Sequence, residues 1–527
     1  MMLESLNIPN LKIDILEANS RVGGRIFTHR FSNDDDDYYD VGAMRFPKIA
    51  IMKRAFDLFK MTKMEIIPYY LDGGPSCPSL FNDRLFVPDT KDPFHISNSN
   101  GGVVPDNLAH PDDVGAAMNA VFEPYKTALE EDFDRGFRLL LSVDDFSTRE
   151  YLRRGGPNGD RESRYDFHTI QWMETLSTGT NLFDQAFAES VVDSFHFDGS
   201  SNADPATWWR IKGGTERLTH EMQRRLRTKV QTGKRVEGIY MNPDSAAREA
   251  SMSVMCAGER KKREGYHTVF NTTSLGCLGR MDMTTLDLHP VQRDAIRSLH
   301  YDDSTKVALK FSHPWWIDHG ITHGGAGSTD RPIRVCVYPS YESNDKDEIL
   351  KKPAVLLASY TWSQDATRMG SLLQPGAVHP KEAELVDLIL RDLASLHNLA
   401  YDDLKKLYIG VHHGFSWSQD PFTAGAFALF GPGQFSNFYP YLTRPASKGN
   451  FHIVGEAAST HHAWVVGSLN SAYAAVYKFL LQHHLFQYMD RHTQLWGTVD
   501  EFDSSETGIA HLQVALAHLE EGEKLKI

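Results

Sequence analysis

The sequence contains few cysteines, no long apolar run and no excess of positive charge. Its four cysteines are widely separated and form no Cys-x-x-Cys pair, which argues against a disulfide framework and a structural zinc site. Lys and Arg number 55 against 69 Asp and Glu, so the net charge of -14 disfavours nucleic acid or an anionic membrane as a partner. The longest apolar stretches are too short to span a bilayer. We expect a globular chain without either kind of partner.

The chain also lacks a Gly-x-Gly-x-x-Gly loop ahead of its first strand. Residues 11–16 alternate like a strand, Glu17 follows, and Gly23, Gly24 and Arg25 come soon after. In a dinucleotide-binding βαβ unit such an acid binds the adenosine ribose, and the phosphate-binding glycines precede it by about 20 residues. Glu17 leaves no room for them, so we expect the chain to begin inside a nucleotide-binding domain. The start shows no signal-peptide pattern, and the sequence assigns no location.

Length and composition are those of a globular enzyme with two or three domains, since 41% of the 527 residues are hydrophobic and 24% are charged. Apolar spacing predicts helices over 50–61, 384–397 and 467–477 and a helical block over 111–209. Alternating residues predict strands over 38–41, 230–240, 251–256, 266–271, 305–312, 333–338, 354–362 and 451–454. Gly324–Gly327 is interpreted as a flexible turn, and Thr215 as a helix cap.

Four separated segments occur in a diagnostic order: Glu17–Arg25, Val41–Pro47, Tyr360–Ser363 and Gly455–Asn470. Together they resemble the flavin-containing amine oxidase superfamily, and most of all its L-amino acid oxidase branch of microbial and fungal type. The similarity runs in the same order from about residue 11 to about residue 480. A single double glycine would be weak evidence, but four motifs far apart in one order are specific.

The resemblance implies an α/β and α+β fold with three parts. The first is a discontinuous, Rossmann-like FAD-binding domain, truncated at its N-terminus and formed by 1–46, 210–303 and 446–486. A substrate-binding sheet domain comprises 47–110 and 304–445. A helical domain over 111–209 forms part of a substrate funnel, and 487–527 form a polar helical tail. The resemblance also suggests a dimer or a larger assembly.

The implied activity is oxidative deamination, in which an L-amino acid, oxygen and water give a 2-oxo acid, ammonia and hydrogen peroxide. The α-hydrogen would leave as a hydride for flavin N5. Two rival interpretations remain. A flavin-dependent amino-acid 2-monooxygenase would share the motifs and give an amide and carbon dioxide. A truncated paralogue unable to hold FAD would have no activity. The side chain accepted is not readable from the sequence.

The resemblance also implies a set of FAD contacts. The acid Glu17 would bind the ribose, the Gly23–Arg25 turn the diphosphate, and Glu456 the ribityl chain, while the helix near Gly467 would direct its positive end at the flavin. The full set of implied cofactor residues is Glu17, Arg21, Gly24, Arg25, Gly42, Ala43, Met44, Arg45, Val236, Glu456, Ala463 and Trp464. Glu17 could equally be a surface acid, and Val236 a packing residue of a strand.

Arg45 carries the substrate-class hypothesis. In the amino acid oxidase branch the matching arginine pairs with the substrate carboxylate, and a guanidinium offers two parallel donors for that purpose. Tyr360 matches a tyrosine that adds a second hydrogen bond, and Trp362 and Trp172 are candidate pocket walls. The alternatives are a structural ion pair for Arg45 and core positions for Tyr360 and both tryptophans.

Two catalytic candidates follow from the same resemblance. Lys306 matches a lysine that holds a water near flavin N5, where a cation would stabilise developing superoxide. Strand lysines usually face solvent, which is the alternative. Trp464 matches an aromatic wall beside flavin and substrate. The preceding His461 and His462 lack a third ligand at metal-binding spacing, so we interpret them as loop histidines and expect no metal.

Overall fold

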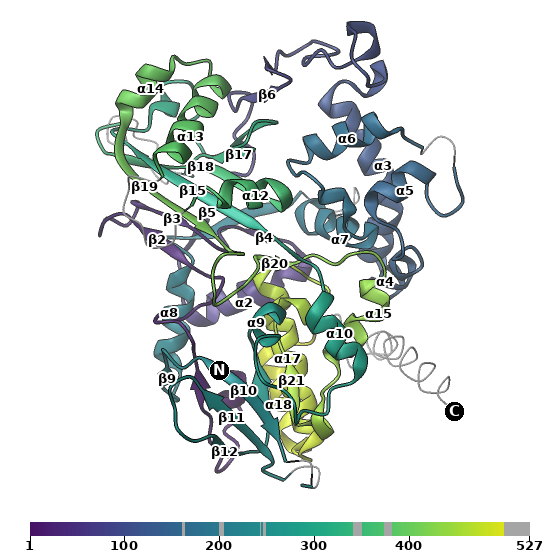
Figure 1. Cartoon of the computed structure of the whole chain (residues 1–527), viewed down its shortest axis with the longest axis vertical. Coiled ribbons are helices and arrows are strands. Elements are labelled where there is room, and N and C mark those ends of the chain that lie inside the picture. Colours follow the sequence, from purple (N-terminus) through teal and green to yellow (C-terminus); the bar gives the residue numbers. More distant parts are fainter. Residues whose placement is uncertain are drawn as a thin grey trace.

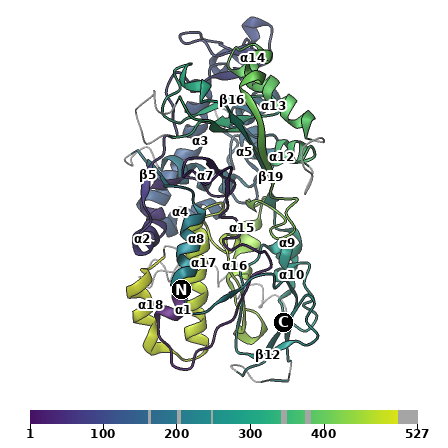
Figure 2. The same cartoon turned by 90° about the vertical axis from the view of Figure 1, so that its left-hand side faces the viewer.

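The computed structural model describes residues 1–160, 164–199, 205–242, 244–245, 249–340, 350–373 and 382–499. The molecule is elongated (Figures 1 and 2). In Figure 1 the lower part holds the N-terminus, short strands and a long helix, the upper left a large sheet, and the upper right a group of helices. Parallel and antiparallel pairings occur together, which confirms the predicted α/β and α+β fold class. No helix of the described residues is long and apolar enough to cross a membrane.

The lower part contains two separate parallel strand pairs. Strand β1 (Ile15–Leu16) pairs with β9 (Val230–Gln231), and β13 (Val269–Asn271) pairs with β21 (Phe451–Ile453). Next to them lies an antiparallel sheet of β10 (Val236–Met241), β11 (Met252–Cys256) and β12 (Arg263–Tyr266). The helices of this part are α1 (Met2–Ser5), α8 (Glu216–Arg225), α9 (Leu275–Leu278), α10 (Pro290–Ser298), α15 (Gln434–Asn437), α16 (Tyr439–Thr443), α17 (Val465–Gln482) and α18 (Met489–Trp496). Each parallel pair joins segments far apart in the chain.

The large sheet has seven strands in the order β19-β15-β18-β17-β16-β6-β7. Their bounds are Tyr408–Ser416, Ser304–Phe311, Ala354–Trp362, Val335–Val337, Ala326–Thr329, Ser79–Phe81 and Arg84–Leu85. One face packs beneath α12 (Ser363–Gly370), α13 (Ala383–Leu396) and α14 (Tyr401–Leu407). The other face packs against β2 (Thr28–Arg30) and β3 (Tyr38–Asp40). Strand β15, which lies between β19 and β18, is therefore buried on both sides.

A smaller sheet connects the large sheet to the helical block. Strand β8 (Thr207–Ile211) lies between β4 (Phe46–Lys48) and β5 (Ile66–Pro68), and helix α2 (Lys53–Thr62) follows β4. A further two-stranded pair is β14 (Tyr301–Asp302) with β20 (Phe427–Ala428). Because β4 begins directly after Arg45 and β8 contains Trp208, this small sheet brings two sequence-distant segments together.

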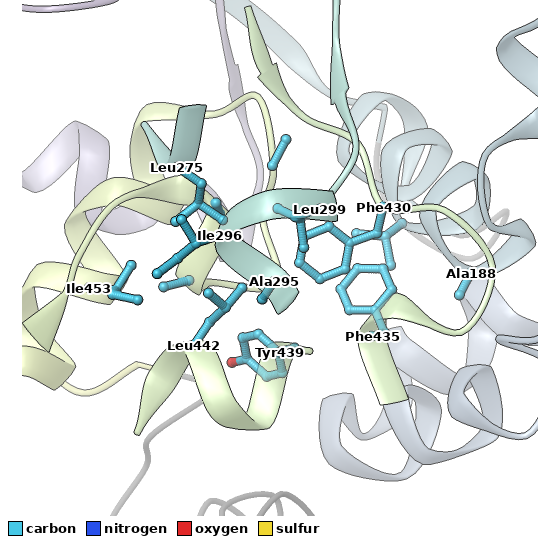
Figure 3. Packing of buried hydrophobic residues seen from close by; sticks show 14 of the residues in the cluster. Ala188, Leu275, Ala295, Ile296, Leu299, Phe430, Phe435, Tyr439, Leu442 and Ile453 are labelled. Atoms are coloured by element: carbon cyan, nitrogen blue, oxygen red, sulfur yellow. The ribbon is translucent and has the colours of Figure 1, made fainter. Parts of the chain in front are cut away.

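The helical block consists of α3 (Pro111–Glu131), α4 (Phe133–Leu141), α5 (Thr148–Arg154), α6 (Phe167–Leu176) and α7 (Phe187–Asp198). A proline at the first position of α3 and the Asp132 cap of α4 set two of their starts. Figure 3 shows that one apolar cluster extends from Ala188 of α7 through Phe430 and Phe435 to Leu442 and Ile453. This continuous core fixes the helical block against the lower part.

Two local predictions differ in part from the structure. Gly324 and Gly325 do form a turn with φ of 70° and 88°, but Ala326 already begins β16, which pairs with Val337 of β17. Strand pairing therefore overrides the flexible turn predicted for Gly324–Gly327. Thr215 precedes α8 as predicted, yet its side chain makes no capping bond. Of the predicted tail, α18 lies within the described residues, while 500–527 lie outside them.

Candidate active site

Lys306 lies in the middle of β15 and is almost fully buried. Its ammonium donates to the carbonyl oxygens of Asp40, at 3.0 Å, and Gly42, at 2.8 Å. The side chain is directly opposite Tyr360 on β18, with Nζ 4.5 Å from the centre of that ring. Burial lowers the pKa of Lys306 to about 7, with Arg45 adding to the effect and Asp40 opposing it. The strand thus turns this lysine inward, not toward solvent.

Arg45 packs against two adjoining aromatic rings, whose centres are 5.3 Å apart. Its guanidinium carbon is 5.2 Å from the ring centre of Phe197 on α7 and 5.8 Å from that of Trp208 on β8. The described residues provide it with no hydrogen-bond or ion-pair acceptor. Its charge acts on Lys306 and on Tyr360, lowering the pKa of both groups. Among the described residues Arg45 thus forms no structural ion pair, the alternative that the sequence left open.

Tyr360 and Trp362 stand side by side at the end of β18, with ring centres 4.1 Å apart. Burial raises the pKa of Tyr360, and the nearby Arg45 opposes this shift. The hydroxyl therefore stays protonated at neutral pH and is available as a donor. Asp193 of α7 also acts electrostatically on Tyr360. These interactions bring β18, α7 and the Arg45 segment to one place.

Trp464 completes an aromatic group on the other side of Arg45. Its ring centre lies 5.6 Å from Phe197, 6.2 Å from Trp208 and 6.1 Å from His196. The group combines side chains from α7, from β8 and from the segment before α17. Among the described residues the buried indole nitrogen of Trp464 has no hydrogen-bond acceptor.

Glu456 and Arg25 contact each other directly. The Glu456 carboxylate accepts from Arg25 at 2.7 Å, from the Ala428 amide at 3.1 Å and from the Ala463 amide at 3.2 Å. Burial acts to raise the pKa of Glu456, but Arg25 and further partners lower it below its usual value. The sequence predicted separate cofactor contacts for these two side chains. Their pairing brings the Gly23–Arg25 turn next to the segment that precedes α17.

The Gly23–Arg25 turn needs its glycines. Gly23 and Gly24 have φ of 106° and 55°, and Arg21 donates to the Gly24 carbonyl at 2.8 Å. Gly42 packs so closely on this turn that a Cβ there would lie 1.8 Å from the Arg25 carbonyl oxygen. The turn and the Val41–Arg45 segment are therefore neighbours.

Two further predicted contacts lie at the lower end of this region. Glu17 follows β1, and its carboxylate accepts from the Asn19 amide at 2.7 Å. Val236 begins β10 and pairs with Cys256 of β11. Neither residue belongs to the group of side chains around Lys306 and Arg45.

Trp172 does not line a pocket, and His461 and His462 do not lie in an open loop. Trp172 is buried among Phe81 and Phe94, as its core alternative required. His461 and His462 are buried side chains: His461 bonds His196 at 2.8 Å, and His462 bonds Glu189 at 2.8 Å. The described residues contain no group of three candidate ligands for a metal ion.

A cavity of about 500 Å³ lies between the helical block and β4. Its walls include Lys48 and Ile51 on one side and Phe133 and Phe195 on the other. Phe195 is two residues before Phe197, and Lys48 is three residues after Arg45. The helical block therefore borders a hollow close in sequence to the residues around Arg45.

A family model for flavin-containing amine oxidoreductases matches residues 5–478. The chain belongs to this family. It is 37% identical over 95% of its length to a Dictyostelium discoideum protein provisionally named a bifunctional amine oxidase, of which it spans 47%. It is 34% identical over 91% of its length to L-amino-acid oxidase 4 of Hebeloma cylindrosporum, of which it spans 79%. The chain thus spans about half of the first relative and more of the second.

Solved structures support the same fold. A putrescine oxidase bound to putrescine superposes with a TM-score of 0.64 at 15% identity, over 91% of this chain and 95% of the other. At that identity the likeness concerns the fold alone. The family makes the chain a flavin-containing oxidoreductase of the amine oxidase type, with FAD as its cofactor.

The residues present fit FAD in a flavin amine oxidoreductase. The backbone is open where a Cβ would stand at Gly24 and Gly455, which has φ of 147°. Helix α17 has no side-chain cap and no acidic residue in its first turn, so its N-terminal amides and positive dipole end favour an anionic group. The buried Trp464 indole nitrogen also lacks a partner in the described chain.

The sequence missed several members of this site. Phe197 and Trp208 hold Arg45, His196 contacts Trp464, and Asp40 contacts Lys306 through its carbonyl. Asp40 stands directly before the Val41–Pro47 motif, which was a usable signal. The other three belong to the helical block and to β8, and only long-range packing brings them to Arg45.

Proposed function

We propose that this chain catalyses the FAD-dependent oxidative deamination of L-amino acids to 2-oxo acids, with release of ammonia and hydrogen peroxide. One observation carries the proposal. Arg45 is held beside Tyr360 and Lys306 without an acceptor from the described residues. A half-buried guanidinium without an acceptor among the described residues keeps its hydrogen-bond donors for a ligand, so the site favours an anionic group.

The geometry around Arg45 suits a carboxylate. Rings of Phe197 and Trp208 attract the guanidinium through cation–π contacts and restrict its orientation. A guanidinium donates two parallel hydrogen bonds to a carboxylate, and the protonated Tyr360 hydroxyl offers a third. A simple amine would leave this cation uncompensated. The printed names of relatives such as the Hebeloma L-amino-acid oxidase support the same substrate class.

Each remaining side chain has a role in this proposal. Bound FAD supplies the acceptor for the hydride of the α-carbon and passes the electrons to oxygen. Lys306 places a positive charge or a bound water at the reacting centre, and Trp464 forms an aromatic wall. We also propose the domain division predicted above, with the helical block contributing a wall of the substrate entrance and a dimer as the assembly.

The test is the substitution Arg45→Met, assayed with L-amino acids and with the amines formed by their decarboxylation. Losing a charge-assisted bidentate contact should reduce kcat/KM for amino acids by about 100-fold. An amine has no carboxylate to make that contact, so kcat/KM for the amine should fall far less. The ratio of the two substrates is the measured quantity, and Arg45→Lys should give an intermediate ratio.

An equal loss for both substrates would contradict the carboxylate role. Products of the native chain provide the second measurement. A 2-oxo acid, ammonia and peroxide in equal amounts are expected, whereas an amide with carbon dioxide would identify the monooxygenase alternative. Flavin absorbance before and after anaerobic addition of amino acids shows whether the chain holds and reduces FAD.

A further inference from the structure

Asp40 is a buried carboxylate that lies outside the four sequence motifs. It ends β3 and is 7% exposed. Its two oxygens accept hydrogen bonds from the Thr28 hydroxyl at 2.5 Å, the Thr215 amide at 2.9 Å and the Thr215 hydroxyl at 3.2 Å. Thr28 in turn accepts from the Glu216 amide at the start of α8. Burial raises the pKa of Asp40 above its usual value, and the Thr28 and Thr215 donors together with Lys306 oppose that shift by favouring the charged form.

The same residue reaches Lys306 in two ways. Its carbonyl oxygen is one of the two carbonyl acceptors of the ammonium, and its carboxylate acts on Lys306 as an opposite charge. In the described residues the charged or titratable groups facing Lys306 are Asp40 from β3, Arg45 from the segment after β3, and Tyr360 from β18. Asp40 is the single carboxylate among them, while Arg45 repels the ammonium.

We propose that Asp40 is a positioning residue for Lys306: it holds the Asp40–Gly42 carbonyls under the ammonium, and its carboxylate supplies a negative charge that favours the protonated form. This inference rests on the proposed function only for its catalytic consequence. Without Asp40, the half-buried Arg45 would repel the buried Lys306 ammonium with no carboxylate facing that ammonium among the described residues. With Asp40, the protonated form of Lys306 is favoured while Arg45 stays available for the substrate carboxylate.

A merely structural role makes a different prediction. A carboxylate that only joins β3 to the start of α8 would leave the pH at which Lys306 titrates unchanged. A carboxylate that sets the charge of Lys306 must change the pH at which Lys306 titrates. Burial lowers the pKa of Lys306 from its ordinary 10.5 to about 7, and Asp40 opposes this shift. Removing the charge of Asp40 should therefore lower the pKa further.

The stability of the fold reports this titration directly. Between pH 7 and 10.5 the folded chain binds fewer protons at Lys306 than the unfolded chain, so stability rises with pH over that window. The experiment compares melting temperatures of the FAD-loaded protein from pH 5.5 to 10 in four forms: native, Lys306→Met, Asp40→Asn and the double variant. Subtracting the Lys306→Met curve from the native curve, and the double-variant curve from the Asp40→Asn curve, gives two difference curves of melting temperature against pH. Each difference curve isolates the titration of Lys306 in its own background.

Lys306 makes stability rise with pH between its folded and its unfolded pKa. We expect the lower limit of this pH range to move down by at least about one pH unit in the Asp40→Asn background. A shift of this size is usual for an opposite charge at close range. Asp37→Asn is the matched control. Asp37 pairs at 2.6 Å with Lys310, on the same strand and face as Lys306, and its removal should leave the Lys306 curve unchanged. Asp40→Glu, which keeps the charge, should restore most of the native curve.

Coincident curves for the native and Asp40→Asn backgrounds would overturn the inference. If Asp40→Asn does not fold, Thr215→Val provides the test, because it removes one donor that favours the charged carboxylate and should shift the curve the same way by less. An unshifted curve in Thr215→Val would then overturn it. In an active preparation, turnover that needs the Lys306 cation declines as pH rises. In Asp40→Asn this decline should begin at a lower pH than in the native protein. Absence of amino-acid turnover would count against the proposed function alone.

Discussion

At the scale of single residues, the site is defined by two buried or half-buried cations. Lys306 is satisfied by carbonyl oxygens and by the charge of Asp40, whereas Arg45 is held by aromatic faces. Hydrogen-bond acceptors neutralise the first cation within the protein. The second retains its donors for a ligand. In the proposed function, this difference in surroundings separates Lys306, at the reacting centre, from Arg45, which binds the substrate.

Tyr360→Phe tests the hydroxyl beside Arg45. Removing one hydrogen bond to a charged carboxylate should raise KM for L-amino acids by about 10-fold, with kcat changed less and the flavin content unchanged. Tyr39→Phe is the matched control, because the Tyr39 hydroxyl bonds His413 at 2.7 Å on the neighbouring strand. A larger fall in kcat than rise in KM would assign Tyr360 to the chemical step.

At the scale of elements, a buried acid–base pair joins helix α7 to the segment before α17. Glu189 accepts from the Phe430 amide at 3.0 Å and contacts His462 at 2.8 Å. Burial acts to lower the pKa of His462, but Glu189 and Glu456 raise it above its ordinary value. Because His462 lies two residues before Trp464, this pair fixes both the aromatic wall and the contact between helical block and lower part.

Glu189→Gln should destabilise the fold in a pH-dependent way. A histidine with a raised folded pKa stabilises the fold below its ordinary pKa of 6.5, and this contribution is lost as pH rises through the folded pKa. The melting temperature should therefore fall more at pH 6 than at pH 9, and breaking a buried pair costs about 3 to 5 kcal/mol.

Glu221→Gln on the surface of α8, where Glu221 pairs with Arg224 and Arg225, is the control and should change little. An equal fall for Glu189→Gln at both pH values would contradict a charged His462.

At the scale of the whole molecule, the residues expected to contact FAD come from segments that several hundred residues separate. The Gly23–Arg25 turn, the Val41–Arg45 segment and the start of α17 are joined by the Arg25–Glu456 pair and by Lys306. Figure 1 shows the N-terminus and helix α17 together in the lower part of the molecule. A ligand that contacts all these segments would bind the folded chain only.

Added FAD should therefore raise the melting temperature of flavin-depleted protein in proportion to the logarithm of its concentration. At 100 times Kd the expected gain is about 2.7 kcal/mol. Riboflavin, which lacks the diphosphate and adenosine, is the control and should stabilise less. A melting temperature independent of FAD concentration would favour the interpretation of a chain that cannot hold the cofactor.

Family and cofactor follow from the sequence by itself, because short motifs such as Glu17–Arg25 and Gly455–Asn470 keep their residue types and order wherever the fold places them. Only the tertiary structure decided the rest. It turned Lys306 inward opposite Tyr360, buried His461 and His462, put Trp172 in a separate core, and gave Arg45 its aromatic neighbours. Burial and the pKa values that it shifts depend on which distant segments pack together, and neighbours along the chain carry no record of that packing.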